Sequence, residues 1–217
     1  LMVLFVTGTS VFADVGLKHK QKNIKCIQTE YFDIIFPEER SESASHIAAN
    51  ADRIYTEICD THCMEKWLHI PVVISSATEE FYTSNDTMPH TKIIIVDSTP
   101  DELSSASADY LLDAFRHEIT HAVLANYKNN FFKGLGKYTS DLISFWLLTS
   151  SSFLEEGSAA ASQTTQIDGP LHDPYYLHHY KQALIENKFP GIDDVEGVRD
   201  IYPFGKEAFY FGGPFID

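Results

Sequence analysis

The stretch FRHEITHAVLANY, residues 115–127, decides how this chain is expected to fold. Within it His117 and His121 stand four residues apart, and Glu118 directly follows the first histidine. On a helix, side chains four residues apart lie on one face, about 6 Å apart along the axis, so two imidazoles can meet at one ion. Glu118 is turned about 100° from His117, which suits a base acting on a metal-bound water better than a third ligand. The stretch therefore predicts a helix with a metal site on one face.

The rest of this helix is predicted to be buried. Its other apolar positions form a stripe at helical spacing: Leu112, Phe115, Ile119, Ala122 and Val123. Ala114 and Ala125 share the histidine face, where small side chains leave room for a cleft. The alternative is an ordinary helix whose two histidines are solvated and paired with acids. A catalytic zinc needs three protein ligands and this stretch supplies two, so a residue from elsewhere must decide.

A second segment, FLEEGSAAAS at residues 153–162, is also predicted to be helical and places a glutamate directly before a glycine. Together with the HExxH pattern, it resembles the gluzincin superfamily of zinc metallopeptidases, which includes thermolysin-like and leukotriene-hydrolase-like aminopeptidase branches. In that superfamily the third zinc ligand is a glutamate on a later helix, often in the context L-x-E-G-x-A. LEEGSA at residues 154–159 matches this context.

The resemblance implies a zinc ion held by three side chains: His117, His121 and Glu156. It also implies that Glu118 is the general base. Glu155 is the rival third ligand, and the position of Glu156 next to glycine favours Glu156.

A weaker match concerns the stretch FYFGGPF, residues 209–215, which resembles the Y-x-x-G stretch of the aminopeptidase branch. By this resemblance Tyr210 is the expected oxyanion donor, with Tyr202, His178 and His179 as rivals. The structural alternative for Tyr210 is a packed aromatic side chain.

The resemblance further implies that the strand before the HExxH helix lies at the cleft edge and pairs with an extended substrate. KIIIVD at residues 92–97 resembles that strand, although a covered strand is the alternative. Residues 83–90 are expected to form a loop.

Three departures from the family pattern stand out. The segment between His121 and Glu156 is longer than usual, and Ala160 occupies the position where the thermolysin-like branch has an acid that orients a zinc histidine. The Gly-x-Met-Glu-Asn anchor of the aminopeptidase branch is absent from the sequence. The sequence also does not match the metzincins, another class of zinc peptidase, because Leu124 and Tyr127 stand where a metzincin needs Gly and His.

The remaining pattern predicts an α+β fold, with a small, mostly antiparallel sheet packed with helices, a mostly helical part after it, and the zinc cleft between them. Strands are expected at 31–37, 70–76 and 91–97, and helices from Ser41, over 101–127, 153–162 and 175–186, and from about 207. A turn is expected at 167–174, and a loop with a short buried helix within 128–152. The expected division is a signal-peptide remnant at 1–13, an α+β subdomain with the HExxH helix at 14–128, and a helical subdomain with the third zinc ligand at 129–217. Further chain is expected after the last segment.

Composition limits the partners. The 217 residues carry 16 Lys+Arg against 31 Asp+Glu, a formal charge of -15, which disfavours nucleic acid and anionic membranes. Residues 1–13 are expected to be the remnant of a signal peptide, with a buried first strand as the alternative, and no other membrane insertion is expected. Cys59 and Cys63 are compatible with a local disulfide, a weak metal site with His62, or plain apolar packing, and Cys26 is left over.

These observations predict an exported zinc metallopeptidase, periplasmic, cell-surface or secreted, acting on a peptide or protein substrate. The alternative is a catalytically inactive, peptidase-like binding module of a larger exported protein. A helical domain without a metal is the third possibility.

Overall fold

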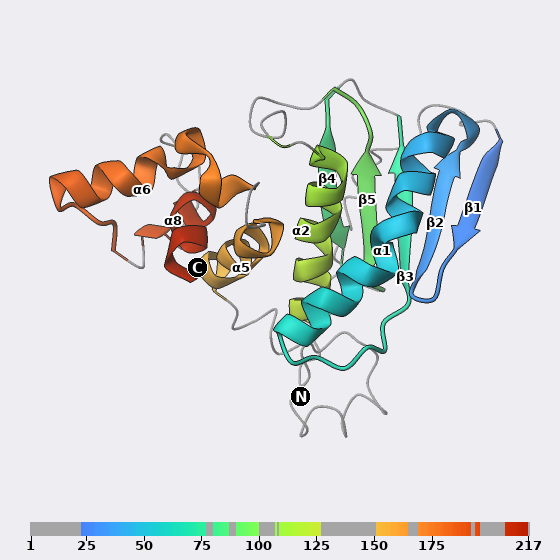
Figure 1. Cartoon of the computed structure of the whole chain (residues 1–217), viewed down its shortest axis with the longest axis horizontal. Helices are drawn as coiled ribbons and strands as arrows, with labels where there is room; N and C mark the ends of the chain where they lie inside the picture. The colour runs from blue at the N-terminus through green and yellow to red at the C-terminus, as the bar shows by residue number, and fades with distance from the viewer. Residues whose placement is uncertain are drawn as a thin grey trace, which may run out of the picture.

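The computed structural model describes residues 23–76, 80–86, 90–99, 107, 109–126, 151–164, 169–191, 194–195 and 207–216. Its strands are β1 (Ile24–Gln28), β2 (Phe32–Pro37), β3 (Ile70–Ser75), β4 (Tyr82–Asp86) and β5 (Lys92–Val96). Its helices are α1 (Ser41–Thr61), α2 (Tyr110–Ala125), α5 (Ser152–Gln163), α6 (Pro174–Glu186) and α8 (Glu207–Ile216), with short 3-10 helices η1 (Glu38–Arg40) and η3 (Pro170–His172). The architecture is α+β, as predicted (Figure 1).

The sheet is mixed, with the strand order β1-β2-β3-β5-β4. The outer pairs β1/β2 and β4/β5 are antiparallel, whereas β2/β3 and β3/β5 are parallel. The expectation of a mostly antiparallel sheet was therefore wrong. For β2 and β3 the cause is helix α1, which carries the chain across the sheet between them and so returns it in the same direction. β5 is parallel to β3 because the chain first passes to the edge strand β4 and then turns back into the place beside β3.

The expected edge strand was also wrong. β5 pairs with β3 on one side and β4 on the other, so it lies inside the sheet. The edge is β4, which from Thr83 onward lies in the stretch 83–90 that was expected to be a loop. Its letters, YTSND, are polar because an edge strand with half-exposed side chains needs no apolar alternation. β1, the other edge, is likewise largely exposed and was not predicted.

One face of the sheet forms the core with α1 and α2 (Figure 1). Along β2 and β3, buried residues alternate with half-buried ones, as expected for strands with one covered face. The strand residues in this core are Phe32, Ile34, Phe36, Ile70, Val72, Ile74, Ile93 and Ile95. Phe115, Ile119, Ala122 and Val123 of α2 bury the predicted stripe against them. Because this side of α2 packs against the sheet, only the opposite side of the helix remains available for a functional site.

Helix α2 begins at Tyr110, later than the predicted start at 101. The Asp109 side chain accepts a hydrogen bond from the Leu112 backbone N–H and so caps the helix there. Residues 100–106 lie outside the described part. Helix α1 begins at Ser41 as predicted, and the predicted turn at 167–174 contains η3.

The helical part packs on α2 through α5, and α8 packs on α5 with α6 beside it (Figure 1). Gly157 of α5 and Gly212 of α8 lie at this crossing, where a Cβ on Gly157 would come within 2.6 Å of the Gly212 carbonyl group. Glycine at both positions therefore lets the two helices approach closely.

Several expectations lie outside the described residues: the signal remnant at 1–13, most of segment 128–152, and Tyr202. The three cysteines are unpaired, and Cys59 is buried in the core, so the local disulfide expected as one alternative is wrong. Over the described ranges no helix has both the length and the apolarity to cross a bilayer.

Candidate metal centre

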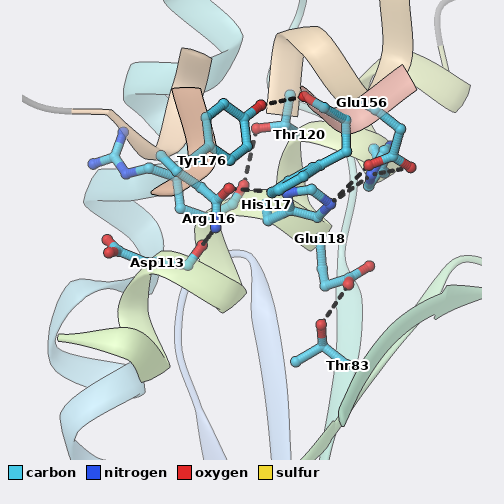
Figure 2. A network of polar contacts seen from close by, with 11 residues as sticks. Thr83, Asp113, Arg116, His117, Glu118, Thr120, Glu156 and Tyr176 are labelled. Atoms are coloured by element: carbon cyan, nitrogen blue, oxygen red, sulfur yellow. Dashed lines mark hydrogen bonds and ion pairs between the residues drawn. The ribbon is translucent and has the colours of Figure 1, made fainter. Parts of the chain in front are cut away.

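The candidate site forms where α5 packs against α2. Helix α2 supplies His117 and His121, and α5 supplies Glu156, whose carboxylate points at the imidazoles (Figure 2). The Glu156 oxygens lie 3.4 Å from Nε2 of His117 and 3.5 Å from Nε2 of His121. The two Nε2 atoms are 2.9 Å apart. The two imidazoles, one turn apart on α2, and the carboxylate from α5 therefore converge on one point.

Local structure explains why Glu156 faces the histidines. Ser151 caps α5 by accepting from the Leu154 backbone N–H, which sets where the helix begins. Gly157 faces α8 at the close crossing, so the preceding residue is turned about 100° away from that crossing. Glu155 is not part of the group of three residues that converge. The geometry therefore selects Glu156 over its rival.

This group has the properties of a metal site. Among the described residues it is the one set of three or more His, Cys, Asp and Glu side chains whose ligand atoms all lie within 4.8 Å of one another. A tetrahedral ion with bonds of about 2.0–2.2 Å holds its ligand atoms roughly 3.3–3.5 Å apart, which the carboxylate distances match. The two Nε2 atoms, 2.9 Å apart, would have to move only slightly apart to reach the same spacing. The group can hold a metal ion.

The charges in the group favour a cation. Burial raises the pKa of Glu156, but the hydrogen bond from Nε2 of protonated His117, whose two ring nitrogens both carry hydrogen, and the charges of the two histidines outweigh it, so the pKa is lowered overall and the carboxylate is ionised. Burial lowers the pKa of His121 to about 4, assisted by the charge of His117, so this imidazole is neutral near pH 7. Burial also acts to lower the pKa of His117, but Glu156 and Glu118 raise it.

Glu118 lies beside the group without belonging to it. Its side chain is buried, and Oε1 accepts a 2.6 Å hydrogen bond from the Thr83 hydroxyl of β4 (Figure 2). Burial raises the pKa of Glu118, opposed by the charge of His117 and by the Thr83 hydrogen bond. A carboxyl group with a raised pKa beside a metal position is suited to accept and release a proton near neutral pH.

A further side chain from α5 reaches the first histidine. Oε1 of Gln163 lies 3.2 Å from Nδ1 of His117, and Nε2 of Gln163 donates to the Asp113 carbonyl at 3.3 Å. The sequence showed that Ala160 cannot orient a histidine. In the structure Ala160 is buried in a cluster with Tyr176 and Tyr210 instead.

Tyr210 is buried in this cluster, which matches the packed-aromatic alternative. Its ring lies 5.6 Å from that of Tyr176 and 4.7 Å from that of His179. His178, on α6, contacts the Tyr175 carbonyl through Nδ1 at 2.6 Å. The role of Tyr210 as oxyanion donor stays a prediction.

Sequence reasoning missed three residues at or beside this site. Thr83 was missed because its stretch was expected to be a loop. Gln163 follows Glu156 by seven residues, which is about two helical turns, so the spacing places both on one face of α5 and was a usable signal. Tyr176 was also missed; its hydroxyl donates to the Phe209 carbonyl, and the charge of Glu156 helps burial to raise its pKa.

Comparison with known proteins gives one relative and no family. The chain is 31% identical over 194 residues to an "Uncharacterized protein" of Treponema pallidum (strain Nichols), an alignment that covers 88% of this chain. The chain spans 17% of the length of that relative. No family model matches the chain, and no solved structure matches it.

Proposed function

We propose that this chain is a zinc metallopeptidase domain of gluzincin type, that it is exported, and that it hydrolyses peptide bonds in a peptide or protein substrate. The observation that carries the proposal is the meeting of His117 and His121 from one helix with Glu156 from another. An ordinary helix with two solvated histidines would not need a half-buried carboxylate brought to both imidazoles from a distant segment.

Zinc is the metal that the donor set favours. Two imidazole nitrogens and one carboxylate are the ligands of many catalytic zinc sites, which keep a fourth position for water. A bound zinc ion would supply Lewis acidity and lower the pKa of a water in the site toward about 7. The Glu156 side chain is 35% exposed, so water and substrate can reach the ligands.

The proposed base is Glu118. It is adjacent in sequence to a ligand but turned away from the group, and the Thr83 hydroxyl holds one of its oxygens. Its carboxylate would accept the proton of the attacking water and then donate it to the leaving amine. Burial keeps its pKa raised, which favours the first of these steps, acceptance of the proton from water.

An extended peptide is the substrate form that the fold supports. β4 lies at one end of the strand order and its Thr83 side chain contacts the proposed base. A sheet edge offers backbone N–H and C=O groups that can pair with an added strand. A peptide paired there would lie beside Glu118.

The decisive test compares wild type with Glu118→Gln in zinc content and in cleavage of a mixed peptide library read by mass spectrometry. We expect both proteins to bind zinc and the variant to lose at least about 100-fold in rate, because the base is removed while the ligands remain. Glu155→Gln is the matched control and should cleave like wild type. Equal cleavage by Glu118→Gln would contradict the mechanism.

Zinc binding without cleavage of any library peptide would favour the inactive binding module instead. Export rests on residues 1–13 and is tested separately, by finding whether the protein in its native cell lacks them and lies outside the cytoplasm.

A further inference from the structure

We propose that Gln163 is a positioning residue that holds His117 in the tautomer protonated at Nδ1, so that Nε2 presents its lone pair to the metal position. This inference rests on the proposed metal site. It concerns a residue outside the ligand group, on the last turn of the helix that also carries Glu156.

The orientation of the Gln163 amide follows from its two neighbours. The Asp113 carbonyl oxygen can only accept, so the amide group that lies 3.3 Å from it must be the NH2 donor. The amide oxygen then faces Nδ1 of His117 at 3.2 Å. Reversing the amide would set oxygen against oxygen and leave Nδ1 beside a donor.

The tautomer of His117 follows in turn. An amide oxygen only accepts, so Nδ1 must carry the hydrogen, and a neutral imidazole has only one N–H. Nε2 therefore carries the lone pair, and Nε2 is the atom that faces Glu156 and His121. Metal-binding histidines commonly donate their other N–H to a neighbouring acceptor, which fixes the ring.

The proposed ligand Glu156 and the positioning residue Gln163 lie on the same helix, α5. Seven residues separate Glu156 from Gln163, so both lie on the side of α5 that faces α2. A neutral amide here orients His117 without adding a second negative charge beside it. Since Gln163 also binds the α2 backbone at Asp113, it couples the position of α5 to the angle of the imidazole.

The first experiment uses wild type alone. 15N NMR of the metal-free protein at alkaline pH, where His117 is neutral, reports which imidazole nitrogen is protonated, and His117→Gln assigns the signal by its loss. We expect the Nδ1-protonated form. An Nε2-protonated form would overturn the proposal, and this outcome does not depend on whether the protein cleaves peptides or binds zinc.

The second experiment measures zinc affinity by competition with a chromophoric chelator. Gln163→Leu, which has no acceptor, should weaken zinc binding about 10–100-fold and lose the tautomer preference. Gln163→Glu keeps an acceptor oxygen toward Nδ1 and should retain the tautomer and bind zinc more tightly than the leucine variant. Ser162→Ala, on the same helix, is the control and should match wild type.

Equal zinc affinity in Gln163→Leu, Ser162→Ala and wild type would overturn the proposal. If the leucine variant does not fold, the decision falls to Gln163→Glu and to the wild-type NMR result. Loss of the Nδ1-protonated form in Gln163→Glu, with its fold intact, would also contradict it. Failure of wild type to bind zinc would instead contradict the proposed function.

Discussion

The Thr83 hydroxyl donates a 2.6 Å hydrogen bond to Oε1 of Glu118 and thereby joins the edge strand β4 to the helix α2. The strand that we propose as the substrate-pairing edge therefore also holds the proposed base. A peptide that paired with β4 would be in register with the carboxylate because both are fixed to the same short segment of backbone.

Substitution Thr83→Val should slow peptide hydrolysis about tenfold or more while leaving KM and zinc affinity nearly unchanged. The variant loses a hydrogen bond to a charged group, which contributes about 1.5–3 kcal/mol. Because that bond stabilises the ionised carboxylate, its loss should also shift the acidic limb of the pH–rate profile to higher pH. Steady-state kinetics over a pH series measures both effects.

Thr83→Ser is the matched control, since it keeps the hydroxyl and should stay within a few-fold of wild type. An unchanged pH profile in Thr83→Val would show that the hydrogen bond does not act on the base.

Substituting each of the two neighbouring glutamates in turn should show which one binds the metal. Glu156→Gln should weaken zinc binding at least about 100-fold, because it removes one of three ligands and its charge. Glu155→Gln removes the same charge from the same helix and should bind zinc like wild type. Chelator competition gives both affinities, and the reverse order would exclude Glu156 as the ligand.

Zinc affinity should fall as the pH falls, with a slope of about one proton. The pKa of His117 is raised by Glu156 and Glu118 against the effect of burial, whereas burial and His117 lower that of His121 to about 4. Zinc must therefore displace a proton only from His117, and Kd should rise about tenfold per pH unit below the pKa of His117. Competition titrations from pH 8 to pH 5.5 measure the slope.

A slope near two protons over this range would mean that His121 is also protonated there. That result would contradict the lowering of its pKa by burial.

The helix crossing that carries Glu156 should be sensitive to a single methyl group. A Cβ at Gly212 would lie 2.4 Å from the Phe153 carbonyl oxygen, and backbone on both sides cannot yield cheaply. Gly212→Ala should destabilise the protein by about 1–3 kcal/mol, as overpacking usually does, even though alanine favours helix. Thermal unfolding should show a lower Tm, by about 2–4 °C per kcal/mol.

Gly191→Ala is the control for this experiment. A Cβ at Gly191 would meet only the Asp194 carboxylate at 3.5 Å, an ordinary contact. Its Tm should stay close to that of wild type, and an equal fall in both variants would remove the case for close packing at Gly212.

Much of the fold was predictable because its signals are local. The apolar residues of α1 recur at helical spacing from Ser41, and β2, β3 and β5 are short stretches rich in β-branched or aromatic residues that form the buried face. β4 escaped prediction because YTSND has the letters of a loop, and only its pairing with β5 makes it a strand. The parallel pairings escaped because strand direction leaves no trace in a strand's own letters.

The candidate site also has one part that was predictable from local sequence and one part that depends on tertiary packing. By itself, the sequence determined that His117 and His121 share a helix face, since that depends only on helical geometry over four residues. Tertiary structure alone decided that the Glu156 carboxylate reaches them and the Glu155 carboxylate does not. It also placed Thr83, 35 residues from Glu118, and Gln163, 46 residues from His117, at hydrogen-bonding distance. The spacing of Glu156 and Gln163 places both on one face of α5, but which helix that face meets depends on how α5 packs against α2. The packing of β4 against α2 likewise has no repeat or spacing in the letters of β4 that encodes it.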